Sequence, residues 1–195
     1  DTLFYVHRNQ LMSLRPPIEA TATLLTISTL LLGDPTLNLP TWGIFLGWAA
    51  TSLCGRPTKA TTGAIGRALL VGGFFALLTL LLRDALLTHS ALNFPAWGAT
   101  LIALTVINPL MLLLGRLKAL SLVPGMFIGF STVLATYFGG FGPGPENVLS
   151  AFICGTTMNV LGIGFSWAAV TLSRATQNKN SDLPSKPRLA AVNTP

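Results

Sequence analysis

The sequence predicts an all-α, polytopic membrane protein with six transmembrane helices arranged as three tandem helical hairpins. Of its 195 residues, 51% are hydrophobic and 9% are charged, whereas soluble proteins carry about 25% charged residues. A bilayer core of about 30 Å needs about 20 mostly apolar residues per helix, and apolar runs fill most of residues 16–174. Lipid is therefore the expected solvent for most of the chain.

Six expected spans follow one another and cover residues 18–32, 41–53, 68–82, 97–114, 120–140 and 148–172. Prolines precede the first span and Pro124 lies in the fifth, where proline suits an opening helical turn because its missing N–H has no intrahelical partner. Trp42 and Trp97 stand where interfacial aromatic residues belong, at the start of the second and fourth spans. The sixth span follows FGGFGPGPEN, residues 138–147, which is too rich in glycine and proline to continue a helix.

An internal repeat supports the hairpin arrangement. LNLPTWG at residues 37–43 recurs as LNFPAWG at residues 92–98, and Pro145 occupies the equivalent place before the sixth span. Pro40, Pro95 and Pro145 are 55 and 50 residues apart, a period typical of a duplicated supersecondary unit. We therefore expect three hairpins of one orientation around a pseudo-threefold axis.

The basic residues predict the orientation. If both termini lie on one side of the membrane, that side collects 11 of the 12 Lys and Arg residues and leaves only Arg83 on the other. The positive-inside rule places the basic side in the cytoplasm. The net charge of +6 is thus explained by membrane topology, and no nucleic-acid partner is predicted.

The flanks of the transmembrane domain, residues 16–174, differ from it in composition. Residues 1–15 mix aromatic, aliphatic and basic side chains, which suits an arm on the membrane surface, although a poorly ordered terminus is an alternative. Residues 175–195 are polar and contain several prolines, which predicts a loosely held tail.

The uncharged polar residues within the spans are candidates for function: Asn108, Thr156, Thr157 and Asn159. A buried amide or hydroxyl in hydrocarbon needs a hydrogen-bond partner. One interpretation is a polar lining for a small neutral solute. The other, which is the commoner use of such residues, is hydrogen bonding between helices at about 0.6 kcal/mol per bond.

Two pairs of glycines have the spacing that lets helix backbones approach closely: Gly43 with Gly47, and Gly125 with Gly129. They predict tight packing within the chain or against a partner.

One acidic residue near a span end has basic neighbours. Glu19 lies in the first turn of the first span, where a carboxylate is favoured by the helix dipole. Arg15 or Arg67 is positioned to pair with it at the inner face.

The sequence offers no catalytic, cofactor or metal site. His7 and His89 are the only histidines and fall on opposite faces of the membrane, and no Ser, Cys or Thr is accompanied by a suitable base. We therefore predict a protein that is not an enzyme and needs no cofactor.

Three segments resemble a known family: residues 42–60 (WGIFLGWAATSLCGRPTKA), 120–138 (LSLVPGMFIGFSTVLATYF) and 148–169 (VLSAFICGTTMNVLGIGFSWAA). They are similar to segments of small bacterial inner-membrane proteins grouped under domain of unknown function 1097, and the resemblance extends over residues 18–174. It implies a multi-pass protein of the bacterial inner membrane, and the basic residues place both termini in the cytoplasm. It implies no substrate and no catalytic residue.

Two hypotheses follow for the function. The first is a channel or facilitator for a small neutral solute, motivated by the repeat, the glycine pairs and the uncharged polar residues. The alternative is a non-catalytic accessory or assembly subunit of a larger energy-converting membrane complex. In either case the partners are the lipid bilayer and, through the N-terminal arm and the glycine faces, further copies of the chain or other subunits.

Overall fold

The computed structural model describes residues 18–55, 57–89 and 94–180, and this part of the chain is all-α, as predicted. The elements, in order, are α2 (Ile18–Leu31), α3 (Trp42–Ser52), α4 (Lys59–His89), α5 (Ala96–Leu114), the short 3-10 turn η2 (Lys118–Leu120), α6 (Val123–Phe138) and α7 (Val148–Asn180). The expected N-terminal arm, residues 1–15, lies outside the described residues. The predicted tail begins as helix, since α7 continues to Asn180.

Three of the helices are long and apolar enough to cross a membrane: α4, α5 and the Val148–Leu172 part of α7. The 31 residues of α4 correspond to about 46 Å at 1.5 Å per residue, more than the apolar core of a bilayer. Two shorter apolar helices, Ala22–Leu31 and α6, accompany them. The 11 residues of α3 extend about 16 Å, about half of the bilayer core.

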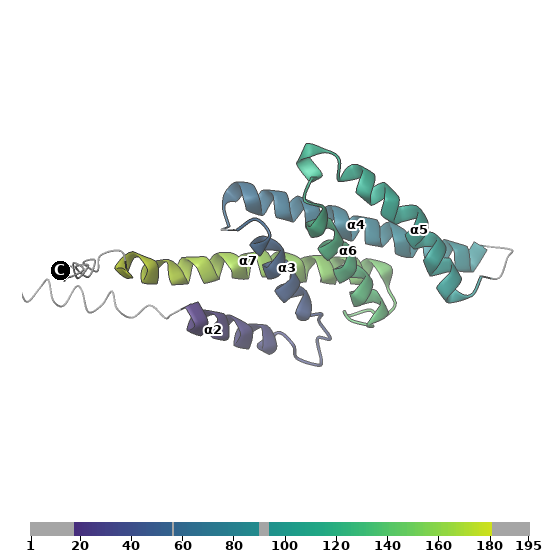
Figure 1. The fold of residues 1–195 in the computed structure, drawn as a ribbon. Helices are drawn as coiled ribbons and strands as arrows, with labels where there is room; N and C mark the ends of the chain where they lie inside the picture. The colour runs from purple at the N-terminus through teal and green to yellow at the C-terminus, as the bar shows by residue number, and fades with distance from the viewer. Residues whose placement is uncertain (1–17, 56, 90–93, 181–195) are drawn as a thin grey trace, which may run out of the picture.

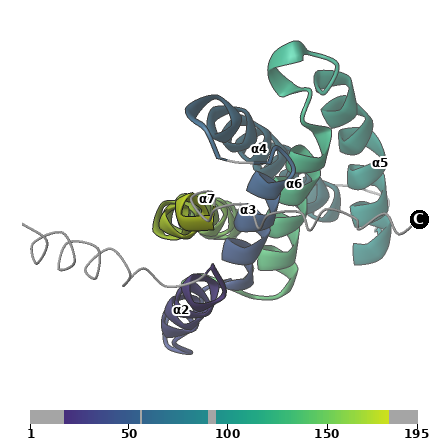
Figure 2. The same cartoon turned by 60° about the vertical axis from the view of Figure 1, so that its left-hand side comes forward.

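The two longest helices organise the molecule (Figure 1). α4 and α7 run in opposite directions along the bundle, whereas α3 and α6 cross them steeply in both views (Figures 1 and 2). α2 packs on α7, and α5 packs on α4. The short helices α3 and α6 are thus enclosed by the long ones, with α2 and α5 at the periphery.

The α2–α3 linker and the α6–α7 linker are joined at one end of the bundle. The side-chain Nδ2 of Asn38 donates to the carbonyl oxygen of Gly140 at 2.7 Å, and the N–H of Gly142 donates to the carbonyl oxygen of Asn38 at 2.7 Å. Gly140 and Gly142 both have positive φ, 68° and 99°, a conformation that glycine adopts without a steric penalty. The rings of Trp42 and Phe141 meet edge to face beside this contact.

α3 crosses α7 at a pair of glycines. A Cβ on Gly47 would overlap the backbone of Asn159, and a Cβ on Gly162 would overlap the carbonyl oxygen of Ile44. Each helix therefore presents a glycine to the backbone of the other, and the two backbones are in direct contact.

α6 crosses α4 in the same way. A Cβ on Gly129 would overlap the backbone of Leu69, and a Cβ on Gly72 would overlap the carbonyl oxygen of Met126. The pattern is the same as in the α3/α7 crossing. Each glycine contacts the backbone of the other helix three residues before the glycine on that helix.

The two crossings reveal a twofold internal repeat. Gly47 and Gly129 are 82 residues apart, and Gly72 and Gly162 are 90 residues apart. The sequence GIFLGW at residues 43–48 corresponds to GMFIGF at residues 125–130. The peripheral helices are also equivalent, because α2 packs on α7 and α5 packs on α4, the helix equivalent to α7. Two three-helix units, a first unit of α2–α3–α4 and a second unit of α5–α6–α7, are therefore related by a pseudo-twofold axis.

These units take the place of the three tandem hairpins expected from the sequence. LNLPTWG and LNFPAWG precede α3 and α5, which are not equivalent helices in the two units. Both motifs place a proline just before a new helix and a tryptophan in its first turn, so they mark the start of a helix. They do not mark the unit that is duplicated.

The apolar core follows the α6/α4 crossing and extends to α5. Its buried members are Ala68, Phe75, Ala76, Leu80, Ile107, Met111, Met126, Phe130 and Val133. A smaller cluster of Ala50, Ile65, Leu69 and Ile163 lies between α3, α4 and α7.

Candidate functional site

A group of uncharged polar side chains is buried where α6 and α7 meet. Asn159 is 1% exposed and lies near the middle of the apolar part of α7, Val148–Leu172. Its Oδ1 is 3.2 Å from the hydroxyl of Thr132 on α6. At the next turn toward the α6–α7 linker, a Cβ on Gly155 of α7 would lie 3.2 Å from the hydroxyl of Thr136 of α6. We call Thr132, Thr136, Thr156 and Asn159 the central polar cluster.

The hydroxyl of Thr132 faces two acceptors. It lies 2.8 Å from the carbonyl oxygen of Ile128, one turn earlier in α6, and 3.2 Å from Asn159. A hydroxyl has a single hydrogen, and the shorter contact is the usual back-bond of a helical threonine. The amide of Asn159 therefore keeps hydrogen-bonding capacity that Thr132 does not use.

Thr156 has a buried hydroxyl oxygen without a partner among the described residues. It lies over Gly73 of α4, because a Cβ on Gly73 would be 3.3 Å from this oxygen. Asn108 Oδ1 and Ser150 Oγ are also buried without a partner in this part of the chain. Since an unsatisfied buried polar group costs about 1–3 kcal/mol, each of these atoms calls for an explanation.

The central polar cluster lies near the pseudo-twofold axis. α4 and α7 run antiparallel (Figure 1), and Gly73 faces Thr156. Leu69 and Asn159 each lie within about one turn of these two residues on their own helices. They are also equivalent residues, because each is covered by the corresponding glycine of the other unit, Gly129 and Gly47.

The residues predicted as a polar lining are partly brought together. Thr156 and Asn159 share the buried face of α7, whereas Thr157 is exposed on the opposite face. Asn108 is on α5, which packs against α4. The sequence alone does not separate these cases, because all four residues lie at similar depth in apolar segments.

The structure adds Ser166 to the polar face of α7 and shows its partner, Thr51, on α3. Both are buried, and the hydroxyl of Thr51 on α3 donates to that of Ser166 at 2.6 Å. The spacing of Asn159, Gly162 and Ser166 is that of one helix face. That spacing is the signal by which this face can be found in the sequence.

The glycines predicted for packing all lie at the crossings. Gly47 and Gly129 are in backbone contact as described, and Gly43 and Gly125 face the Cβ atoms of Met158 and Ala68, respectively, each at 3.0 Å from the position of an added Cβ. The glycines opposite them, Gly72 and Gly162, were not predicted, although small residues lie four positions away, Ala68 and Ala76 for the first and Ser166 for the second.

The inner-face ion pair predicted from the sequence falls only partly within the described residues. Arg15 and the side chain of Glu19 lie outside them. The exposed Arg67 directs its Nε to the carbonyl oxygen of Ala119 at 3.4 Å, which joins the start of α4 to the α5–α6 linker.

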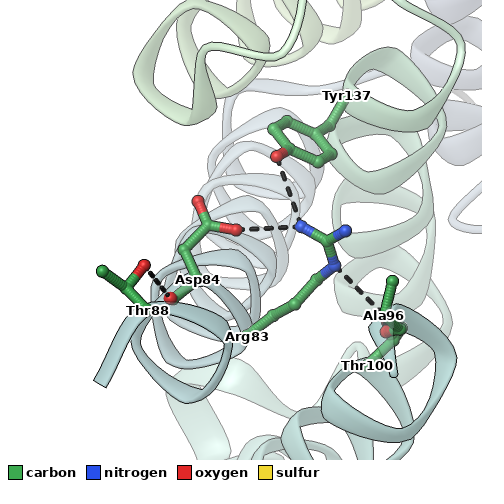
Figure 3. A network of polar contacts seen from close by, with 6 residues as sticks. All are labelled: Arg83, Asp84, Thr88, Ala96, Thr100 and Tyr137. Carbon is green, nitrogen blue, oxygen red and sulfur yellow. Dashed lines mark hydrogen bonds and ion pairs between the residues drawn. The ribbon is translucent and has the colours of Figure 1, made fainter. Parts of the chain in front are cut away.

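A charged network that the sequence does not reveal lies at the other end of α4 (Figure 3). Arg83, whose side chain is 16% exposed, pairs with Asp84 at 2.9 Å. Its Nε donates to the hydroxyl of Thr100 on α5 at 3.1 Å, and it approaches the hydroxyl of Tyr137 on α6 at 3.4 Å. The guanidinium also lies 5.6 Å from the ring centre of Phe138, within the range of a cation–π contact. This network holds α4, α5 and α6 together.

The chemistry of the central polar cluster is that of hydrogen bonding without charge. No group of three or more His, Cys, Asp or Glu that could hold a metal is present in residues 18–55, 57–89 and 94–180. Cys54 and Cys154 are both free thiols. The central polar cluster can therefore donate and accept hydrogen bonds at mid-depth, and it offers no countercharge to an ion.

Comparison with known proteins identifies the family. The family model described as "Protein of unknown function (DUF1097)" matches residues 20–174. The match covers most of the chain, so the protein belongs to this family, and the resemblance seen in the sequence is confirmed. No curated protein and no solved structure matches the chain.

Proposed function

We propose that this member of the DUF1097 family is a membrane facilitator for a small uncharged solute, built from two three-helix units of opposite orientation. The observation that carries the proposal is the pair of equivalent glycine crossings, α3/α7 and α6/α4. A unit with an odd number of crossings must be followed by a copy that faces the other way. Inverted repeats of this kind are typical of transporters, whose substrate sites lie near the bilayer midplane between the repeats.

The proposal includes six crossings, with α3 and α6 as short helices at membrane depth. A short helix is tolerated there where protein surrounds it, because its free backbone groups then avoid lipid. α3 meets this condition through its packing on α7 and α6. Short or interrupted helices beside a central site are also a recurring feature of transporters with inverted repeats.

The proposed orientation places the Arg67 end of α4 in the cytoplasm of a bacterial cell, together with both chain termini. The contact of Arg67 with Ala119 brings the α5–α6 linker, which carries Arg116 and Lys118, to the same end. Arg83 is at the opposite end of α4. This distribution follows the positive-inside rule.

The poverty of charge in the spans supports a neutral solute. Moving an ion through the central polar cluster would strip its water without supplying an opposite charge, which is costly in a medium of low dielectric constant. Amide and hydroxyl groups replace the water of a neutral solute at much lower cost. The proposal assigns no catalytic step to the protein.

The direct test is solute flux. The purified protein is reconstituted into sealed liposomes, and the entry of urea, formamide, acetamide and glycerol is followed by stopped-flow light scattering against empty liposomes. Entry of at least one solute faster than in empty liposomes is expected. Equal rates for the whole panel would contradict the proposal, and co-purification with other subunits in fixed stoichiometry would then favour the accessory role.

The inverted arrangement has its own test. In right-side-out and inside-out vesicles, single cysteines are introduced as Ala119→Cys and Gly144→Cys in a background where Cys54 and Cys154 are replaced by alanine. A membrane-impermeant maleimide should label the first only from the cytoplasmic side and the second only from the outside. Labelling of both from one side would show that α6 does not cross the membrane.

A further inference from the structure

The two units differ where they should be most alike, at the centre of the α4/α7 pair. Leu69 and Asn159 are equivalent residues, both 2% exposed or less, but Leu69 lies in an apolar cluster with Ala50, Ile65 and Ile163. Asn159 instead accepts a hydrogen bond from the hydroxyl of Thr132. Because the first unit has a leucine at the position equivalent to Asn159, helix packing at this position does not require an amide side chain. The amide of Asn159 therefore needs a reason other than the fold.

Thr156 and Asn159 carry unused hydrogen-bonding capacity side by side. Thr156 Oγ1 has no partner among the described residues, and Asn159 shares the single hydrogen of Thr132 with a carbonyl oxygen. Residues three apart on a helix have Cβ atoms about 5–6 Å from each other, so one small molecule can bond to both. Such a molecule would satisfy groups that otherwise cost free energy in hydrocarbon.

The surroundings restrict the size of the guest. Around Gly73, the hydroxyl of Thr156, the ring of Phe152 and a methyl group of Val133 all lie within 3.4 Å of the place that a Cβ would take. These distances leave no free space beside Gly73, so a guest at Thr156 must be very small and must displace these side chains by a few tenths of an ångström. Phe152 and Val133 are apolar, so the polar contact beside Gly73 comes from Thr156.

We infer that Asn159 and Thr156 are the solute-binding groups of the facilitator, and that the solute is a small neutral molecule with both a donor and an acceptor, of which urea and formamide are simple examples. This inference rests on the proposed function. A hydroxyl and an amide together offer both donors and acceptors, which matches a guest that also carries both. A molecule with acceptors alone would leave the donors of the site unpaired.

The test uses variants of the full chain in the liposome assay, with urea and formamide as probes. Thr156→Val keeps the shape of the side chain and removes its hydroxyl, and Asn159→Leu copies the equivalent residue of the first unit. Each should slow solute entry by about three- to tenfold, the effect of one lost neutral hydrogen bond. Thr156→Ser restores the hydroxyl and should restore entry to within about twofold of the original chain.

The matched control is Thr157→Val. Thr157 is the next residue of α7 but is exposed on the other face, so the same chemical change there should leave solute entry unchanged. Each variant is checked for a single monodisperse peak in detergent and for unchanged helical circular dichroism. Should Asn159→Leu fail this check, Thr156→Val with its serine rescue decides the question.

The outcomes separate the inference from the proposed function. Flux of the original chain equal to that of empty liposomes overturns the proposed function. Flux that is present but the same in Thr156→Val and Asn159→Leu overturns the inference and leaves the function standing. Osmotic water permeability is measured in parallel: if the two variants slow water but not urea or formamide, the guest is water, and the assignment of a solute site is wrong.

Discussion

The two units share a backbone arrangement and differ in the chemistry of their centres. In the α6/α4 crossing, Leu69 and Ala76 of α4 keep the interface apolar. In the α3/α7 crossing, the equivalent positions of α7 are Asn159 and Ser166, both buried. The glycines that bring the helices together are the same in both. The glycine contacts therefore give both crossings the same backbone arrangement, whereas polar side chains occupy the compared positions of α7 only.

The largest expected effect tests whether the crossings are equivalent. Gly47→Ala and Gly129→Ala each insert a methyl group into the backbone of another helix, and each should destabilise the protein by about 3 kcal/mol, the upper end of the usual cost of overpacking. Thermal unfolding in detergent measures both. Gly66→Ala is the control, since a Cβ there meets nothing within 4 Å and should stabilise α4 by up to about 1 kcal/mol. Tolerance of one crossing variant but not the other would show that the units are not equivalent.

Leu69→Asn tests whether the first unit accepts the chemistry of the second. The new amide would stand among apolar side chains and lose about 2 kcal/mol of stability as an unsatisfied buried group. Denaturation by sodium dodecyl sulfate, followed by circular dichroism, gives the change. A neutral result would mean that the amide finds a partner on this side too, and that the polar difference between the units is incidental.

Arg83 belongs to the first unit alone, since the residue 90 positions later is Ser173. Arg83→Met keeps an apolar stem but removes the contacts to Asp84, Thr100 and Tyr137, and should cost about 1 kcal/mol because Asp84 is 41% exposed and partly screened by solvent. The loss should shrink at high salt. The midpoint of thermal unfolding at two salt concentrations measures it, and Arg116→Met, at an exposed position, is the control. An equal loss in both variants would refute a specific role for the network.

Thr51→Val removes the hydrogen bond between α3 and α7. The hydroxyl of Ser166 can return to its own helix backbone, so the expected loss is about 0.6 kcal/mol, the average for such bonds in membranes. Val133→Thr is the reciprocal change at the equivalent position of α6 and should be close to neutral. Unfolding in mixed detergent measures the two. A loss of more than about 2 kcal/mol for Thr51→Val would exceed the range known for such bonds and reveal a wider polar network.

The smallest effect concerns the linker before α3. The hydroxyl and then the N–H of Thr36 donate to Asp34 and lower the pKa of its carboxyl below the ordinary value of 3.8. A carboxyl with a lowered pKa stabilises the folded state above its unfolded pKa, and that contribution is lost as the pH falls through the folded pKa. Thr36→Val should return the pKa toward 3.8, as read by an NMR titration of Asp34. The corresponding linker, residues 115–122, has no carboxylate, so this acid-side change is confined to the first unit.

The sequence predicted the features of the fold that depend on the local spacing of residues within one helix. The spacing of Gly43 with Gly47 and of Gly125 with Gly129 marks the faces of α3 and α6 that pack tightly. The backbones that they contact lie elsewhere in the chain, and nothing local at Leu69 or Asn159 points to them. The repeated GIFLGW and GMFIGF was the available signal, and it competed with the longer identity between LNLPTWG and LNFPAWG.

The charged network was missed for a related reason. Arg83 and Asp84 suggest the end of a span when only neighbours in sequence are considered, yet α4 continues to His89. The partners that accommodate Arg83 come from α5 and α6, 17 and 54 residues away. The polar cluster is intermediate: the residue types were predicted, but which of them face one another depends on helix rotation. Thr156 and Thr157 differ by one position, which rotates the side chain by about 100° around the helix axis and leaves Thr157 exposed.

The exchange of partners between the two units has a consequence for synthesis of the protein. Gly47 and Gly72 of the first unit are covered only by α7 and α6, which leave the ribosome later. The residue that covers Gly47, Asn159, follows 112 residues later in the chain, a delay on the order of 5–20 seconds at ordinary rates of translation. During that interval the nascent first unit must keep its glycine faces against lipid or against another membrane protein. Co-translational assembly of this small bundle can therefore start at the α6/α4 crossing, but the α3/α7 crossing forms only after the final helix has been synthesised.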